Sequence, residues 1–274
     1  MRPLLPLLVC TLVASAAETE PTKLAVADAY PLDPGTIQVD VGLSAARATR
    51  AFDADGRAAK RGSTASTHTL DLGLDYGLLP SLEIGTHIAL VRTAESDGDP
   101  DSGRGLSDWD VGAKWQAWSH EDGDLAVAVG ALPTVAIPLG RGQDADSQLP
   151  TASRAWSAGG VACVCGNWDR LSFNADAGYV AFLGTADERD GSRGQWVADA
   201  AVGWLVCEHF QPEVDVSYGR DRPEEGQAAW ATTVTIGAQF PFDGGRLMAG
   251  LSKVVDGVLV DQEVSANVML QYEL

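Results

Sequence analysis

The sequence predicts an all-β fold: an antiparallel transmembrane β-barrel of about 12 strands, with short periplasmic turns and long extracellular loops. Three observations support this prediction. Apolar and polar residues alternate with a period of two over most of the chain. The connections between the alternating segments are short and long in turn, and aromatic residues gather at the ends of these segments. Together, these features are typical of outer-membrane barrels.

The alternation is clearest near residue 274. Val264, Val268 and Leu270 have one parity, whereas Glu263 and Asn267 have the other. Because successive side chains of a strand point to opposite faces, this segment has one apolar and one mostly polar face. The pattern recurs along the chain, and no competing stretch has the 3.6-residue period of a helix. It continues to the last residue, so we expect the last strand to pair with the first, because an open edge cannot lie in hydrocarbon.

The connections alternate in length. The short ones lie near residues 77–81, 119–124, 166–170, 207–209 and 241–245. The others are mostly longer and rich in Gly, Asp, Ser and Arg, near residues 47–65, 92–106, 138–153, 183–194, 219–228 and 254–262. In outer-membrane barrels the short turns are periplasmic and the long loops extracellular. The barrel is therefore predicted to comprise residues 35–274.

Two groups of aromatic residues are expected at the membrane interfaces, where such side chains are favoured. On the long-loop side they are Trp109, Trp156, Trp196 and Trp230, and on the short-turn side they are Tyr76, Trp115, Trp204, Phe240 and Tyr272. The alternative fold is a soluble secreted β-sandwich, which also alternates. A sandwich would hold its large aromatics in mid-strand, and its polar face would carry more Lys and Arg than this one does.

The N-terminus has the features of a secretory signal peptide. Arg2 precedes the apolar stretch Leu4 to Val13, and Ala14-Ser15-Ala16 forms a small-x-small cleavage site. Residues 1–16 are therefore predicted to be removed on export, and the mature protein is predicted to reside in the outer membrane of a Gram-negative bacterium. Residues 17–34 are predicted as a periplasmic N-terminal segment, which either plugs the lumen from below or extends freely.

Composition excludes several classes of function. With 38 acidic against 19 basic residues, the formal net charge is −19, which argues against a nucleic-acid partner. Four cysteines in 274 residues do not make a disulfide scaffold. Once Cys10 is removed, the oxidation state of the other three stays open, and a bridge to Cys207 from either member of the Cys163/Cys165 pair is one alternative.

An aspartate series at 97, 99, 101 and 108 has the spacing of a calcium-binding loop. However, Ser102 replaces the required glycine and Pro100 stiffens the segment, so we expect a solvated acidic loop. No metal or other cofactor is predicted.

The inward-facing parity is unusually acidic. The residues predicted to line the pore are Asp40, Asp71, Asp75, Glu83, His87, Asp108, Asp110, Lys114, Asp176, Asp199, Glu213, Asp215 and Glu263. An acidic lumen favours cations over anions. Alternatively, these acids only keep the interior wet, some of them paired or protonated. Inward glycines such as Gly73 and Gly85 either leave room for solute or provide backbone curvature.

Four blocks carry a resemblance to a known family. They are residues 72–85, with the pattern LGLDYGL followed by LEIG, then Gly105–Trp115, Ala131–Gly140 and Phe173–Tyr179. In this order they resemble the outer-membrane family labelled "putative MetA-pathway of phenol degradation", whose members are described as transporters or channels. The resemblance extends from about Gly35 to the end of the chain. It implies uptake of small molecules, aromatic compounds among them, and transfers no catalytic or binding residues.

The sequence thus predicts a passive outer-membrane channel for small solutes, and no enzyme. One rival is a non-conducting barrel that acts as a receptor or adhesion surface. A second is an outer-membrane hydrolase. However, none of the four histidines is followed by a serine two residues later, as a lipase-type site needs, and Ser66 has this spacing to His68 only in the reverse order. The expected partners are outer-membrane lipid and lipopolysaccharide, the barrel-assembly machinery and a small-molecule solute. The oligomeric state is unknown.

Overall fold

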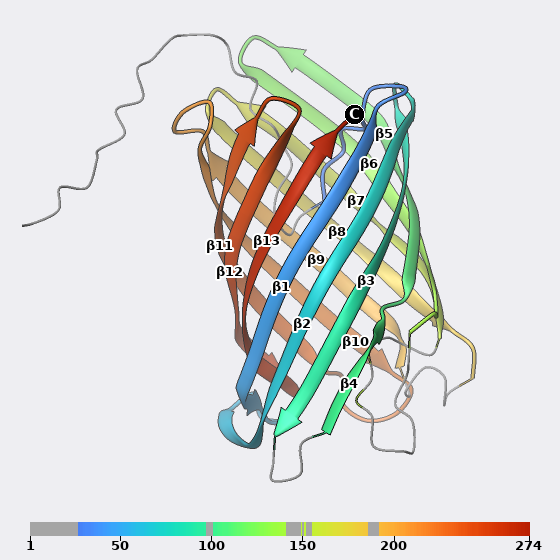
Figure 1. Cartoon of the computed structure of the whole chain (residues 1–274), viewed down its shortest axis with the longest axis vertical. Helices are drawn as coiled ribbons and strands as arrows, with labels where there is room; N and C mark the ends of the chain where they lie inside the picture. Colours follow the sequence, from blue (N-terminus) through green and yellow to red (C-terminus); the bar gives the residue numbers. More distant parts are fainter. Residues whose placement is uncertain (1–26, 97–100, 141–148, 150, 152–154, 186–191) are drawn as a thin grey trace, which may run out of the picture.

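The computed structural model describes residues 27–96, 101–140, 149, 151, 155–185 and 192–274. Its strands join edge to edge into one antiparallel sheet that closes on itself (Figure 1). They are β1 (Ile37–Phe52), β2 (Ala58–Leu79), β3 (Leu82–Ser96), β4 (Asp101–Leu106), β5 (Trp109–Asp122), β6 (Leu125–Ile137), β7 (Trp156–Trp168), β8 (Leu171–Leu183), β9 (Ser192–Trp204), β10 (Gln211–Pro223), β11 (Trp230–Phe242), β12 (Gly245–Val258) and β13 (Val260–Glu273).

β4 and β5 together form one strand of the barrel wall. Both pair with β3, through Leu90↔Leu106 and His87↔Asp110 respectively. The ladder is interrupted at Ser107, whose hydroxyl accepts a hydrogen bond from the Ala89 amide at 2.8 Å. The wall therefore has 12 strands, and the predicted barrel with its strand number is confirmed.

Pairing of β1 with β13 closes the barrel. The register runs from Gln38↔Glu273 to Phe52↔Val260, and β1 also pairs with β2 along its other edge. Beyond the ladder, the Leu274 amide donates to the Ile37 carbonyl at 2.8 Å. This is the pairing of first and last strands that the sequence predicted.

The connections at one end are short, as predicted. They comprise residues 80–81, 123–124, 169–170, 205–210 and 243–244. Gly244 adopts a left-handed backbone conformation with φ of 78°, which a residue with a Cβ adopts only with strain. These turns lie at the end that holds the C-terminus, at the top of Figure 1.

Three of the predicted long loops are wrong. In the predicted loop 92–106, residues 92–96 belong to β3 and residues 101–106 form β4. Most of residues 47–65 continues β1 and β2, and only 53–57 connect them. Likewise, most of 254–262 belongs to β12 and β13, which Leu259 alone separates. Alternation marks a strand only where one of its faces is apolar. These hairpins extend past the alternating stretch, and there their backbone hydrogen bonds hold them together without an apolar face.

The barrel is apolar outside and polar inside. Ile236 and Leu251, neighbours in mid-strand, are each 65% exposed, whereas Asp215, Gln211 and Gln239 are buried. The predicted interface aromatics Tyr76, Trp109, Trp115, Trp156, Trp196, Trp204, Phe240 and Tyr272 are all exposed on the outer wall, and Trp230 is half-buried against Tyr218. The described residues contain no helix long and apolar enough to cross a membrane. This distribution suits a wall surrounded by lipid and does not suit a sandwich with an apolar core.

Leu251→Arg tests the lipid exposure of the outer wall. An arginine at the bilayer midplane should lower the free energy of unfolding by about 2–4 kcal/mol, measured by denaturant titration of protein folded into lipid vesicles. Leu139→Arg, in a connection outside the strands, is the matched control and should have little effect. Equal tolerance of both arginines would contradict a lipid-facing position for Leu251.

Candidate functional site: the lumen and its N-terminal segment

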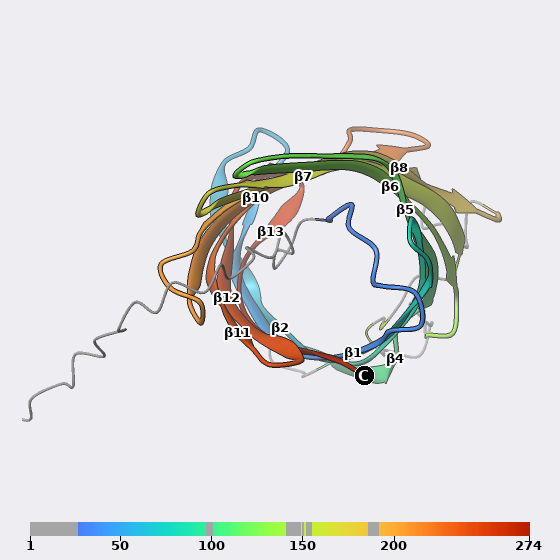
Figure 2. The same ribbon diagram turned by 90° about the horizontal axis from the view of Figure 1, so that it is seen from above.

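The described part of the N-terminal segment lies inside the barrel. Figure 2, seen along the barrel, shows the chain before β1 crossing the lumen. At the entrance to β1, the Gly35 amide donates to the Gly77 carbonyl at 2.8 Å, and the Gly77 amide donates to the Thr36 carbonyl at 3.0 Å. A Cβ at position 77 would lie 2.1 Å from the Asp33 carbonyl oxygen, so this crossing requires glycine. Of the two alternatives that the sequence left open, residues 27–34 follow the plugging one.

Lys114 on β5 binds this segment to the wall. Its Nζ lies 3.2 Å from Asp28 Oδ1 and 3.4 Å from Glu83 Oε1. It also donates to the Tyr30 carbonyl at 3.3 Å, and Glu83 accepts from the Leu32 amide at 2.9 Å. Lys114, the lysine among the predicted pore-lining residues, is therefore shared between a carboxylate of the segment and a carboxylate of the wall.

On β6 and β7, the strands next to β5 in the wall, the segment meets small side chains. Ala29 is fully buried against Ala128, Cys163 and Cys165, and its amide donates to Cys165 Sγ at 3.1 Å. Cys163 and Cys165 are free thiols, as is Cys207, so none of the disulfides considered from the sequence is present. The Cys-Val-Cys pair, which the sequence left unexplained, thus lies where the N-terminal segment packs.

The backbone of Ala27 is also held by polar groups of β8. Its amide donates to Asp176 Oδ2 at 2.9 Å, and its carbonyl accepts from Asn174 Nδ2 at 3.2 Å. Sequence reasoning missed Asn174, because an uncharged inward residue carries no signal of its own. A contact partner in the N-terminal segment could not have been inferred from the alternation.

A second cluster of charged side chains lies beside the segment. His87 Nε2 is 3.5 Å from Asp75 Oδ1, and Gln38 Nε2 donates to both oxygens of Asp40 at 3.0 and 3.2 Å. Asp40, Asp75 and His87 each bring a ligand atom within 4.8 Å of the others, a spacing that suits a metal ion or a hydrogen-bonded cluster equally. His87 therefore lies beside an acid in the lumen.

Inward glycines make room for these side chains. A Cβ at Gly73 would lie 2.6 Å from His87 Nδ1, and one at Gly85 would lie 1.9 Å from Asp75 Oδ1. Because glycine has no side chain, the polar side chains of neighbouring residues can lie flat against the wall at these two positions. This is a third role, which neither alternative drawn from the sequence had anticipated.

Acids on β8–β10 lie within a polar wall. Gln239 Nε2 donates to Glu213 Oε2 at 2.7 Å, and Gln211 Nε2 donates to the Ser172 hydroxyl at 3.1 Å. Asp176 and Asp199 are direct cross-strand neighbours, and Asp215 is fully buried. Part of the acidic set is therefore engaged by wall or segment groups.

The remaining predicted pore residues are spread along the barrel. In the strand ladders, Asp71 lies opposite Gly42, Asp110 lies opposite His87, and Glu263 lies opposite Ala48. Asp108 lies at the break between β4 and β5. The calcium-like spacing cannot be assessed as a site, since Asp97 and Asp99 lie outside the described residues.

An inward cation was missed near the long-loop end. Arg61 binds Asp261 and, through Nη2 at 2.5 Å, Glu95 Oε1, which also accepts from the Ser63 hydroxyl. Sequence reasoning placed Arg61 in a loop, so the direction of its side chain was not considered.

A cavity of about 230 Å³ lies at the other end of the lumen, between the wall and Asp28. It is bordered by Asp40, Asp75, Glu83, His87, Asp110 and Lys114. The lumen thus contains a narrow space lined by charge beside a segment held by polar contacts.

Comparison with solved structures places the fold. The COG4313 outer membrane channel from Pseudomonas putida F1 overlays with a TM-score of 0.78 at 13% identity, covering 94% of this chain and 100% of that one. The β domain of the Bordetella autotransporter BrkA (TM-score 0.49, 12% identity, 86% and 100% covered) and the KdgM porin (0.47, 8%, 86% and 98%) overlay more loosely. A search of curated proteins found no match.

The family assignment comes from the sequence itself. The family model described as "Putative MetA-pathway of phenol degradation" matches residues 25–257, which include part of the N-terminal segment and all but the last strand of the barrel. Because the match covers most of the chain, this protein belongs to that family.

Proposed function

We propose that this protein is an outer-membrane channel that passes small solutes, aromatic compounds among them, through a lumen narrowed by its own N-terminal segment. The observation that carries the proposal is a closed lipid-facing barrel whose polar interior holds residues 27–34. The family description, which refers to phenol degradation, and the similarity in fold to an outer membrane channel support it.

The acidic lining suggests a preference for cations and neutral solutes. Acidic residues outnumber bases among the inward-facing positions, and a lumen with low-dielectric walls concentrates this negative potential. The buried acids Asp176, Glu213 and Asp215 contribute less to it than acids that remain accessible. Asp71, Asp110 and Asp199 are only partly buried or exposed and are the candidates for this role.

The rival hydrolase has little geometric support. Within the described residues no histidine hydrogen-bonds a serine: His87 contacts Asp75, His120 stacks on Trp118, His209 approaches the Pro241 carbonyl, and His68 lies exposed on the outer wall. The other alternative is a non-conducting receptor. A conductance measurement distinguishes it from a channel, because only a channel passes ions.

Neutralising accessible acids tests the selectivity. Asp71→Asn/Asp110→Asn/Asp199→Asn should shift the reversal potential in a salt gradient toward zero or toward anion preference, because each change removes a negative charge from the lumen. Single-channel recording in a planar bilayer measures this. Asp243→Asn, in a periplasmic turn, is the control.

A folded, heat-modifiable barrel that never conducts would contradict the channel and favour the receptor. Conduction with unchanged selectivity in the triple variant would contradict only the acidic filter.

A reversible lock tests the role of the N-terminal segment. Ala29→Cys places a thiol beside Cys165, whose Sγ already contacts the Ala29 amide. If the segment must move for solute to pass, oxidation should hold conductance low, and a reductant should restore it on the same channels.

The control is Ala29→Ser, because serine is similar in size to cysteine and cannot form a disulfide. The conductance of this variant should not respond to the reductant. Confirmed disulfide formation with undiminished conductance would show that the segment does not obstruct the path.

A further inference from the structure

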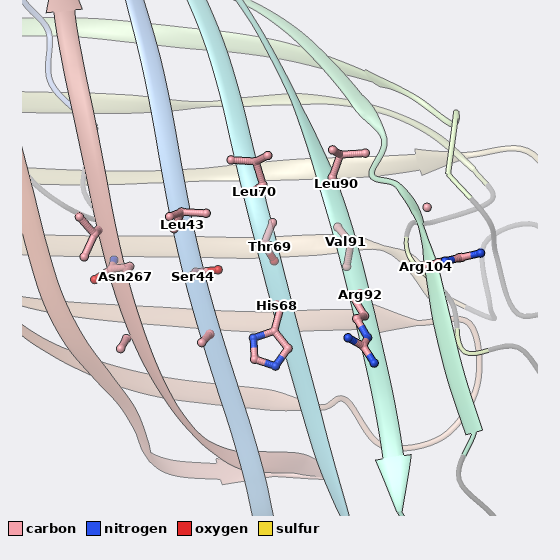
Figure 3. A pocket seen from close by; sticks show the side chains of 14 residues that line it. Leu43, Ser44, His68, Thr69, Leu70, Leu90, Val91, Arg92, Arg104 and Asn267 are labelled. Carbon is pink, nitrogen blue, oxygen red and sulfur yellow. The ribbon is translucent and has the colours of Figure 1, made fainter.

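The outer wall of β1–β4 carries a row of basic side chains. His68 on β2 is the cross-strand neighbour of Arg92 on β3, and Arg92 is the neighbour of Arg104 on β4. Arg47 on β1 lies two residues further toward the long-loop end, opposite Ser66. All four side chains are exposed. Figure 3 shows His68, Arg92 and Arg104 on three adjacent strands, projecting from the same side of the wall.

No acid balances these charges on that face. The outward-facing positions of the four strands hold no Asp or Glu from 39 to 47 on β1, 64 to 76 on β2, 84 to 96 on β3 and 102 to 106 on β4. In the part of the chain that the structure describes, Arg47, Arg92 and Arg104 form no ion pair. Lipid contact explains why this face has no acids, but it does not explain the four bases, which need an anionic partner outside the chain.

A row of leucines adjoins the bases on the side toward the short turns. Leu43, Leu70, Leu90 and Leu106 are cross-strand neighbours in that order. Between leucines and bases lies a shallow depression of about 610 Å³, to which the small residues Ala45 and Ala266 contribute (Figure 3). The face therefore offers positive charge directly beside apolar surface.

The height of the basic row matches a membrane interface. His68 precedes the exposed Tyr76 by eight residues, which is about 26 Å along a strand and about 20 Å along the membrane normal at a tilt of about 40°. The apolar band of such barrels is about 25 Å tall. With Tyr76 at the periplasmic interface, the bases lie near the headgroups of the outer leaflet and the leucines beside its acyl chains.

We propose that this face binds a phosphorylated glycolipid of the outer leaflet, the lipid A portion of lipopolysaccharide. Its phosphates bind Arg47, Arg92, Arg104 and His68, and its acyl chains lie on the leucine row. Arginine suits this role, because its guanidinium offers paired donors to phosphate oxygens. The inference shares with the proposed function only the insertion of the barrel in the outer membrane, and it is independent of what crosses the lumen.

The test measures lipid A binding to the purified full-length protein by native mass spectrometry from detergent. Wild type should bind bisphosphorylated lipid A at least tenfold more tightly than Arg47→Gln/Arg92→Gln/Arg104→Gln. The matched control Arg193→Gln/Arg220→Gln/Arg222→Gln removes three exposed arginines of β9 and β10 and should bind as wild type does. Lipid A without phosphates should bind no better to wild type than to the triple variant.

Three results would overturn the proposal: equal binding by wild type and the triple variant, no preference for the phosphorylated lipid, or inorganic phosphate binding as tightly as lipid A. Self-association through this face would appear as a dimer that the triple variant loses without any lipid dependence, which would also overturn it. If the triple variant fails the heat-modifiability test for folding, Arg92→Gln and Leu70→Ser should each weaken binding measurably. A barrel that conducts but does not prefer lipid A would contradict this inference and leave the proposed channel intact.

Discussion

The structure depends on one constraint: backbone amides and carbonyls in hydrocarbon must find partners within the protein. A sheet meets it only by closing, and here closure rests on the ladder between β1 and β13. The constraint also explains the structure of the wall at the break between β4 and β5. Where β4 gives way to β5, the Ser107 side chain and backbone both bond to the Ala89 backbone, so the interruption leaves that residue paired.

Closure then determines the interior. Because the apolar side chains must face lipid, the lumen receives the polar parity, and its groups must be satisfied by one another or by water. Lys114 is an example, since its buried ammonium group forms ion pairs with Asp28 and Glu83 and donates a hydrogen bond to the Tyr30 carbonyl. Removing one member of a buried charged pair typically costs about 3–5 kcal/mol, since its partner is left uncompensated. The N-terminal segment is thus part of the electrostatic balance of the wall.

The fold could be read from the sequence because lipid imposes a two-residue period wherever a strand touches it. The same reasoning failed for residues 47–65, where the hairpin extends beyond that contact and the pattern fades. The sequence identified the acidic residues of the lumen as a group, but it did not identify the groups that each of them contacts. Whether Asp176 contacts the Ala27 amide or only Asp199 depends on a segment that is not part of the barrel wall, and contacts with such a segment leave no periodic signal in the sequence.

The way in which the segment is held suits a removable obstruction. Beside the Asp28–Lys114 ion pair, its contacts in the lumen are mostly single hydrogen bonds between its backbone and side chains of the wall, at Asp176, Asn174, Cys165 and Glu83. Each such bond contributes about 0.5–1.5 kcal/mol net, or about 1.5–3 where the acceptor is charged, because water replaces it when it breaks. The apolar contact consists of Ala29 against Ala128, Cys163 and Cys165, with Ala27, Tyr30 and Leu132 packed around this cluster. None of these contacts belongs to the β1–β13 ladder, so release of the segment would widen the lumen and leave the wall closed, with the Asp28–Lys114 ion pair as the costliest contact to break.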